Sequence, residues 1–165
     1  MGSGKSSLGR SLALRYELPF YETDAMVESH VGESITSIFQ NEGEAAFRCY
    51  EQEILHSIPT NTPSIVATGG GLPCFSDNAQ WMRAQGFTLY LSLTVKDLIA
   101  RLAHSHTQRP LLLGKHGASL QAYIAALLAQ REPIYRQAHL SIDGNFASPE
   151  YLQELFEKQG MPFTD

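Results

Sequence analysis

The sequence MGSGKSS forms residues 1–7 and is followed at once by leucines at helical spacing between residues 8 and 14. Gly4, Lys5 and Ser6 match the end of the phosphate-binding pattern G-x-x-x-x-G-K-[ST], in which glycines let the backbone wrap around phosphate oxygens. A helix that begins inside such a loop offers free N–H groups and a partial positive charge to phosphates. The stretch therefore predicts a P-loop for a nucleotide, and the alternative is a flexible Gly/Ser terminus.

The strand that normally precedes a P-loop has no counterpart in these 165 residues, because the first glycine of the full pattern would lie before Met1. Four strand candidates follow the loop, at residues 18–22, 64–68, 87–93 and 139–142, and helical segments separate them. This alternation predicts a three-layer α/β/α domain with a parallel sheet. We expect the natural protein to carry about 8–10 upstream residues that supply the first strand; a rearranged sheet is the alternative.

The composition limits the class of protein. The 12 Lys and Arg against 17 Asp and Glu give a net charge of −5, which argues against broad binding of nucleic acid or of anionic membranes. No apolar run approaches the roughly 18 residues of a membrane span. The two cysteines, Cys49 and Cys74, lack metal-ligand spacing. We therefore expect one soluble domain, residues 1–165, in a reducing cytoplasm.

Two candidate site segments follow predicted strands, at the carboxyl edge of the sheet where ligands bind in α/β proteins. Glu22 and Asp24 stand two residues apart, so that one carboxylate can hold metal-bound water while the other accepts a proton from an alcohol. The alternative is that Asp24 only caps the next helix. Gly69–Gly71 carry a high entropic cost, which suggests a backbone that another group must approach closely.

Three arginines are candidates for binding anions. Arg48 lies on a long predicted helix, where the alternative is a solvated pair with Glu44 four residues earlier. Arg131 is expected at the end of a helix, where a cation also complements the helix dipole. Arg109 lies in the polar segment 104–117, which we interpret as a mobile lid that folds over a phosphate.

Taken together, these motifs resemble the shikimate kinase family, in the nucleoside-monophosphate-kinase-like branch of P-loop folds. The resemblance covers nearly the whole chain, and its carriers are MGSGKSS, Tyr21–Asp24, Gly32–Ile35 with Ile38-Phe39, Gly43-Glu44 with Phe47-Arg48, Ala67–Gly71, Arg109–Leu112, and Arg131 with Tyr135. It implies a five-stranded parallel sheet in the order 2-3-1-4-5, whose first, central strand is missing from this chain.

The resemblance also implies an activity: transfer of the γ-phosphate of ATP to the 3-hydroxyl of shikimate, a step toward chorismate and the aromatic amino acids. Residues 24–60 would form a helical region that binds the substrate. The implied catalytic residues are Lys5, Asp24 and Arg109. The implied shikimate contacts are Asp24, Arg48, Gly70, Gly71 and Arg131. The arginines suit a carboxylate because the guanidinium presents a planar fork of donors.

For the nucleotide, the implied contacts are Gly2, Ser3, Gly4, Lys5, Ser6, Ser7, Arg101 and Arg109, with Arg101 a candidate for stacking on the adenine. Mg²⁺ is the expected cofactor, held through Ser6 and Glu22. The family commonly has aspartate where this chain has Glu22, so the geometry of the metal site is expected to differ.

Other functions fit parts of the pattern. A gluconate kinase or a nucleotide kinase shares the fold, although Arg48 with Arg131 favours a substrate that bears a carboxylate. A P-loop GTPase needs an Asn-Lys-x-Asp motif, which the sequence lacks. A non-catalytic nucleotide-binding domain is a further alternative, given the shortened loop. We expect a monomer whose partners are ATP and shikimate, with no nucleic acid and no membrane.

Overall fold

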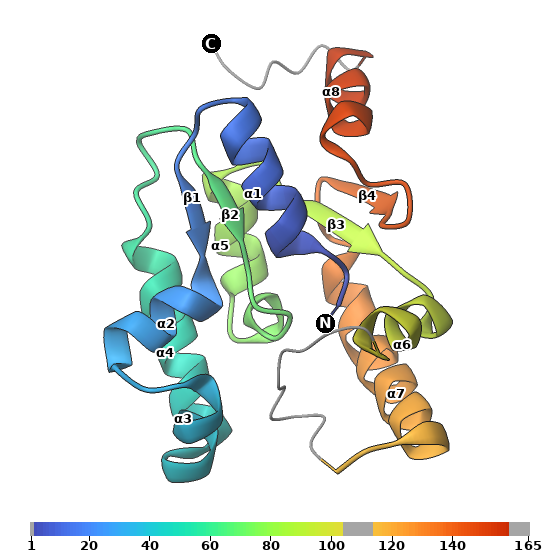
Figure 1. Ribbon diagram of the computed structural model, residues 1–165. Coiled ribbons are helices and arrows are strands. Elements are labelled where there is room, and N and C mark those ends of the chain that lie inside the picture. The colour runs from blue at the N-terminus through green and yellow to red at the C-terminus, as the bar shows by residue number, and fades with distance from the viewer. Residues whose placement is uncertain (1, 104–113, 159–165) are drawn as a thin grey trace.

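The computed structural model describes residues 2–103 and 114–158, and its helices and strands alternate along the chain (Figure 1). The first half contains α1 (Lys5–Arg15), β1 (Phe20–Glu22), α2 (Thr23–Val31), α3 (Ile35–Asn41), α4 (Gly43–Ser57) and β2 (Ile65–Ala67). The second half contains η1 (Leu72–Cys74), α5 (Asn78–Gln85), β3 (Leu89–Ser92), α6 (Val95–Ala103), α7 (Gly117–Tyr135), β4 (Leu140–Asp143) and α8 (Pro149–Lys158). The predicted α/β alternation is confirmed.

The strands form two parallel pairs. β1 pairs with β2 in a register that sets Phe20 beside Ile65, and β3 pairs with β4 in a register that sets Leu89 beside Leu140. Within residues 2–103 and 114–158, no further strand joins either pair. All four strands therefore lie where the sequence predicts them, but the five-stranded order is not complete in the described chain.

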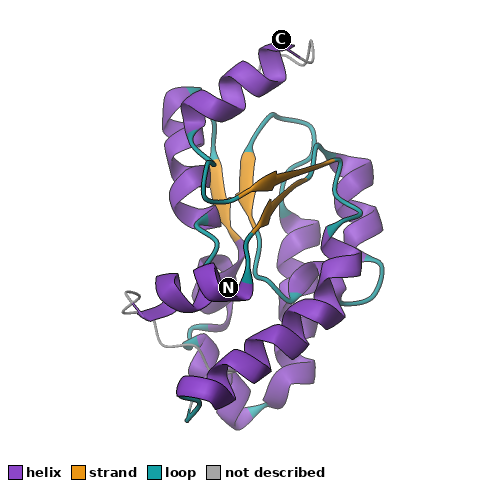
Figure 2. Cartoon of the chain, turned by 90° about the vertical axis from the view of Figure 1, so that its right-hand side faces the viewer, coloured by secondary structure: helices purple, strands orange, loops and turns teal. Residues whose placement is uncertain are grey.

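Helices pack around the two pairs and form separate small cores (Figures 1 and 2). Helices α1 and α8 contribute to a cluster with β3 and β4, made of Leu12, Leu91, Ile142, Leu152 and Phe156. Helices α2, α3 and α4 have a cluster of their own, made of Val27, Ile38, Phe47 and Ile54. The latter unit covers most of the predicted substrate-binding region and rests on the end of β1.

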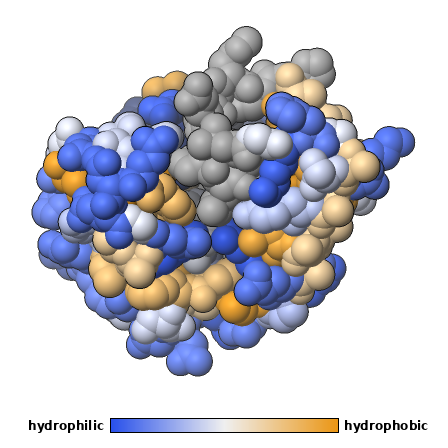
Figure 3. Space-filling model, turned by 90° about the horizontal axis from the view of Figure 1, so that it is seen from below, coloured by the Kyte–Doolittle hydropathy of each residue, from blue (hydrophilic) through white to orange (hydrophobic). Residues whose placement is uncertain are grey.

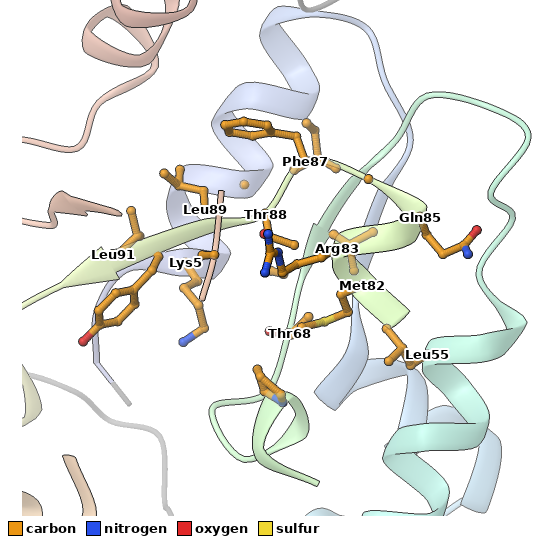
Figure 4. A pocket seen from close by; sticks show the side chains of 18 of the residues that line it. Lys5, Leu55, Thr68, Met82, Arg83, Gln85, Phe87, Thr88, Leu89 and Leu91 are labelled. Atoms are coloured by element: carbon orange, nitrogen blue, oxygen red, sulfur yellow. The ribbon is translucent and has the colours of Figure 1, made fainter. Parts of the chain in front are cut away.

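A cavity of about 790 Å³ lies between the two strand pairs (Figure 4). Its walls include β2 (Ile65–Ala67) on one side and Leu89 and Leu91 of β3 on the other, with Leu8 and Leu12 of α1 as a further wall. Lys5 and Thr68 lie at the end near the P-loop. The cavity is therefore an apolar slot, and the facing edges of β2 and β3 have no strand partner in the described chain.

Two local predictions are wrong. Asp24 is not the N-cap of its helix, because α2 begins one residue earlier, at Thr23, and Glu22 stands at the N-cap position. The Thr23 hydroxyl, at this first position of the helix, accepts a hydrogen bond from the N–H of Gly69. Arg131 does not end α7, since the helix continues through Pro133 to Tyr135. Pro133 lies inside α7 near its end, and the fixed φ of proline is compatible with a helix.

No helix in the described parts of the chain combines the length and the apolarity that crossing a membrane requires.

Candidate active site

The P-loop adopts a conformation that depends on its glycines. Gly2 has a φ of +64° and Gly4 a φ of +87°, in the left-handed region that side chains with a Cβ rarely adopt. Helix α1 begins directly after Gly4, whose carbonyl accepts a hydrogen bond of 2.9 Å from the N–H of Leu8. The first turn of α1 thus directs its free N–H groups toward the carboxyl edge of the strands, where an anion can bind.

Arg101 of α6 fixes the position of this loop. Its guanidinium donates to the carbonyl of Ser3 at 3.0 Å, to the carbonyl of Gly144 at 2.9 Å and to Oδ1 of Asn145 at 3.0 Å. Lys5 points from the start of α1 into the cavity (Figure 4), and its Nζ lies 3.4 Å from Oγ of Ser3. Arg101 therefore joins the P-loop to the loop after β4; its stacking on adenine stays a prediction.

The end of β1 presents two acidic residues with different surroundings. Glu22 accepts a hydrogen bond of 3.0 Å from Arg10. Asp24, in the first turn of α2, has its Oδ1 buried. Between them the Thr23 hydroxyl accepts a 2.9 Å bond from the N–H of Gly69, which ties the end of β1 to the end of β2. Asp24 is thereby held beside the glycine segment.

Arg48 of α4 is buried, with 8% of its surface exposed. Its Nε and Nη2 donate to Glu44 at 3.2 and 2.7 Å, and its Nη1 donates to Glu51. Burial by itself lowers the pKa of Arg48, but the attraction and hydrogen bonds of these carboxylates leave that pKa above its ordinary value. The predicted pair with Glu44 thus exists, yet the guanidinium is not solvated.

Glu51 is the site residue that the sequence reasoning missed. Its side chain is 1% exposed, and burial raises its pKa to about 7 against the opposing charge of Arg48, while Asp24 adds to the increase. The spacing in the sequence does indicate that Glu51 shares one face of α4 with Arg48 and Glu44, because it lies three residues after Arg48 and seven after Glu44. Nothing in that spacing, however, reveals that Arg48 and Glu51 are buried while Glu44 is not.

The glycine segment is approached closely, as the sequence predicts. A Cβ at Gly71 would overlap the guanidinium of Arg48. A Cβ at Gly69 would overlap Oε1 of Glu51 and would lie 2.5 Å from Oδ1 of Asp24. Gly70 differs, since its carbonyl accepts a 2.5 Å hydrogen bond from the hydroxyl of Tyr135. Side chains from α2, α4 and α7 therefore come together at the backbone of residues 69–71.

Arg131 of α7 belongs to the same cluster. Its charge lowers the pKa values of Glu51, Tyr135 and Cys74, each of which burial raises. The structure thus brings together Asp24, Arg48 and Arg131 around the glycine segment, on the side of the P-loop.

Arg109 and most of the predicted lid lie outside the described residues. On the face seen from below, hydrophilic and hydrophobic residues are interspersed, with the hydrophilic ones most abundant on the left (Figure 3).

Replacing Gly71 with alanine tests the close approach. Its φ of −85° suits any residue, so only the contact with Arg48 should matter. Because Glu44 and Glu51 hold the guanidinium on either side, it has little room to retreat, and we expect the free energy of unfolding to fall by about 1–3 kcal/mol. Urea denaturation measures the change. Gly86→Ala, at a site with open space around it, is the matched control; equal effects of the two changes would contradict this account.

A family model described as shikimate kinase matches residues 1–159. The chain belongs to the shikimate kinase family. It is 38% identical over 143 residues to a shikimate kinase of Parabacteroides distasonis, an alignment that covers 87% of this chain and 83% of the relative. It is 34% identical to the shikimate kinase of Bacteroides thetaiotaomicron, over 95% of this chain and 94% of that relative.

Solved shikimate kinases have the same fold. The crystal structure of the enzyme from Bacteroides thetaiotaomicron superposes with a TM-score of 0.87 at 32% identity, covering 98% of this chain and 94% of the other. A shikimate kinase from Acinetobacter baumannii, solved in complex with shikimate, gives a TM-score of 0.84 at 30% identity, covering 97% of this chain and 89% of the other. The α/β shikimate kinase fold is therefore confirmed for this family member.

Proposed function

We propose that the protein is an ATP-dependent shikimate kinase, which transfers the γ-phosphate of ATP to the 3-hydroxyl of shikimate. The observation that carries this proposal is the meeting of Asp24, Arg48 and Arg131 on the Gly69–Gly71 backbone, beside a P-loop. Two guanidinium groups suit a substrate carboxylate, and the partly buried carboxylate of Asp24 next to them suits a substrate alcohol. Membership of the shikimate kinase family supports the same substrate.

Shikimate would bind with its carboxylate between Arg48 and Arg131 and with its ring over the backbone of Gly70 and Gly71. Asp24 would accept the proton of the 3-hydroxyl while the hydroxyl oxygen attacks the γ-phosphorus and ADP leaves. Phosphoryl transfer depends mainly on positioning and on neutralising charge. The rigid support of Asp24, through Thr23 and Gly69, serves that positioning.

The P-loop residues Gly2–Ser7 would hold the phosphates of ATP, with the charge of Lys5 near the transferred group. Mg²⁺ fits the available donors, because it prefers oxygen ligands and needs few protein groups when phosphates and water complete its shell. Ser6 and Glu22 offer a hydroxyl and a carboxylate, although Arg10 already occupies one oxygen of Glu22. The ion would neutralise charge on the phosphates, and Arg109 would act from the lid.

We also infer that an extended segment ahead of residue 2 fills the slot between β2 and β3. It would give the sheet order 2-3-1-4-5, in which the observed pairs β1-β2 and β3-β4 flank the added strand. The apolar walls and the two open strand edges support this inference, because unpaired buried backbone groups are costly.

Hydrogen exchange tests the added strand. The 165-residue chain is compared with the same chain extended by its natural upstream residues. We expect the amides of Ile65–Ala67 and Leu89–Ser92 to exchange at least about tenfold more slowly in the extended chain, since a second partner closes both edges. Amides of β4, which faces away from the slot, serve as the internal control. Equal exchange of β2 and β3 in the two chains would contradict the inference.

A coupled assay of ADP release tests the activity. We expect release from Mg-ATP to depend on shikimate and to stay near background with gluconate or a nucleoside monophosphate. Release with either of those acceptors but not with shikimate would overturn the proposed substrate. A lid formed by residues 104–117, a substrate-binding region at 24–60, a monomeric state and a cytoplasmic location remain predictions.

A further inference from the structure

Two acidic side chains from different helices converge on one backbone position. Oε1 of Glu51, from α4, and Oδ1 of Asp24, from α2, would both collide with a Cβ at Gly69. Both oxygens are buried, and no hydrogen-bond donor reaches Oε1 of Glu51 among the described residues. Two carboxylates that share so small a buried space repel each other when both are charged, and a proton on one of them relieves the repulsion.

The charges that face Glu51 do not remove this repulsion. From its own helix come Arg48, which binds Oε2, and Glu44, which competes for the same guanidinium. Asp24 faces it from α2, Arg131 acts on it from α7, and the Cys74 thiol lies near it on η1. Three carboxyl groups thus lie close to two guanidinium groups, and of the three carboxyl groups Glu51 is buried whereas Glu44 is about half exposed. Arg48 donates to Oε2 of Glu51, and Oε1 lies against the same point of the Gly69 backbone as Oδ1 of Asp24.

We propose that Glu51 is a positioning residue that carries a proton on Oε1, directed at the Asp24 carboxylate, and that shikimate binding increases the fraction of molecules in which it does so. The neutral Glu51 still accepts from Arg48 through Oε2 and therefore continues to orient that guanidinium. Its Oε1–H donates to Asp24, which holds the charged carboxylate in place and ready to accept a different proton.

The second half of the proposal rests on the proposed function. A substrate carboxylate at Arg48 adds a negative charge close to Glu51 and competes with it for the guanidinium. Both effects favour the neutral form of Glu51. Solvent supplies the proton, so binding of shikimate takes up protons when the pH lies near or above neutrality, where part of Glu51 is still charged.

The first test observes Glu51 directly, without substrate. The chemical shift of the side-chain carboxyl carbon of Glu51 is followed by NMR from pH 4 to 9. Through-bond correlations within the residue assign this resonance to Glu51. We expect its midpoint between pH 6 and 8. A midpoint of Glu51 below pH 5 overturns the proposal, whatever the protein does with shikimate.

The second test is calorimetry of shikimate binding at pH 7.5 in buffers of different ionisation enthalpy. We expect net proton uptake, and a dissociation constant that rises by up to about tenfold between pH 7 and 8. Glu51→Gln, which is neutral at every pH, should lose the uptake and the pH dependence, while Glu53→Gln should keep both. Binding without uptake overturns the coupling but not the kinase function. An absence of binding at every pH overturns the kinase function, and with it the coupling, and leaves the NMR result to decide the protonation of Glu51.

Discussion

Arg48→Leu is expected to lower kcat/KM for shikimate by about a hundredfold or more, because removing one partner of a buried charged contact typically costs 2–5 kcal/mol. The proposed ligand carboxylate would lose one of its two guanidinium partners. The loss should fall mainly on KM, since Arg48 would bind a group of the substrate that does not react. Steady-state kinetics with shikimate as the varied substrate measure the split between KM and kcat.

The same change should destabilise the protein. Without Arg48, Glu51 stays buried with no cation bound to it and Glu44 loses its partner, which corresponds to about 3–5 kcal/mol for a broken buried pair. Arg48→Lys keeps the charge but not the fork, so it should recover part of the stability and little of the affinity. Arg136→Leu is the control, because it breaks an exposed pair with Glu132. Equal KM values for wild type and Arg48→Leu would exclude Arg48 from substrate binding.

Asp24→Asn is expected to lower kcat by about 10²- to 10⁴-fold, the usual range for the loss of a positioned general base. Asparagine keeps the shape of the side chain but cannot accept the hydroxyl proton. Because the change removes one of two acidic groups that repel each other at Gly69, the melting temperature should stay equal or rise. A fall in kcat together with unchanged or increased stability would separate catalysis from folding.

The control for this prediction is Asp77→Asn, at an exposed position before α5. It should leave both kcat and the melting temperature within error of the wild type. A loss of only a few fold in Asp24→Asn would mean that the residue orients the hydroxyl without taking its proton. In that case the transferred proton would leave through solvent or phosphate.

Local sequence determined much of this protein. The glycines of the P-loop have the positive φ angles that their residue type predicts, and each of the four predicted strands exists. These features depend on near neighbours: the conformational freedom of glycine, the period of apolar residues and the start of a helix. Glu22 and Asp24 follow β1 as the pattern predicts, and Gly69–Gly71 follow β2.

The tertiary structure alone decided how those pieces act on one another. Glu51 is an ordinary acidic residue in the pattern of α4, yet in the structure it is buried, with Arg48 and the backbone of Gly69 against it. The sequence likewise allows Asp24 to be a helix cap. In the structure, however, Thr23 accepts a hydrogen bond from Gly69, and α2 begins at Thr23. Burial, pairing and pKa arise from contacts between segments far apart in the chain, so no local pattern contains them.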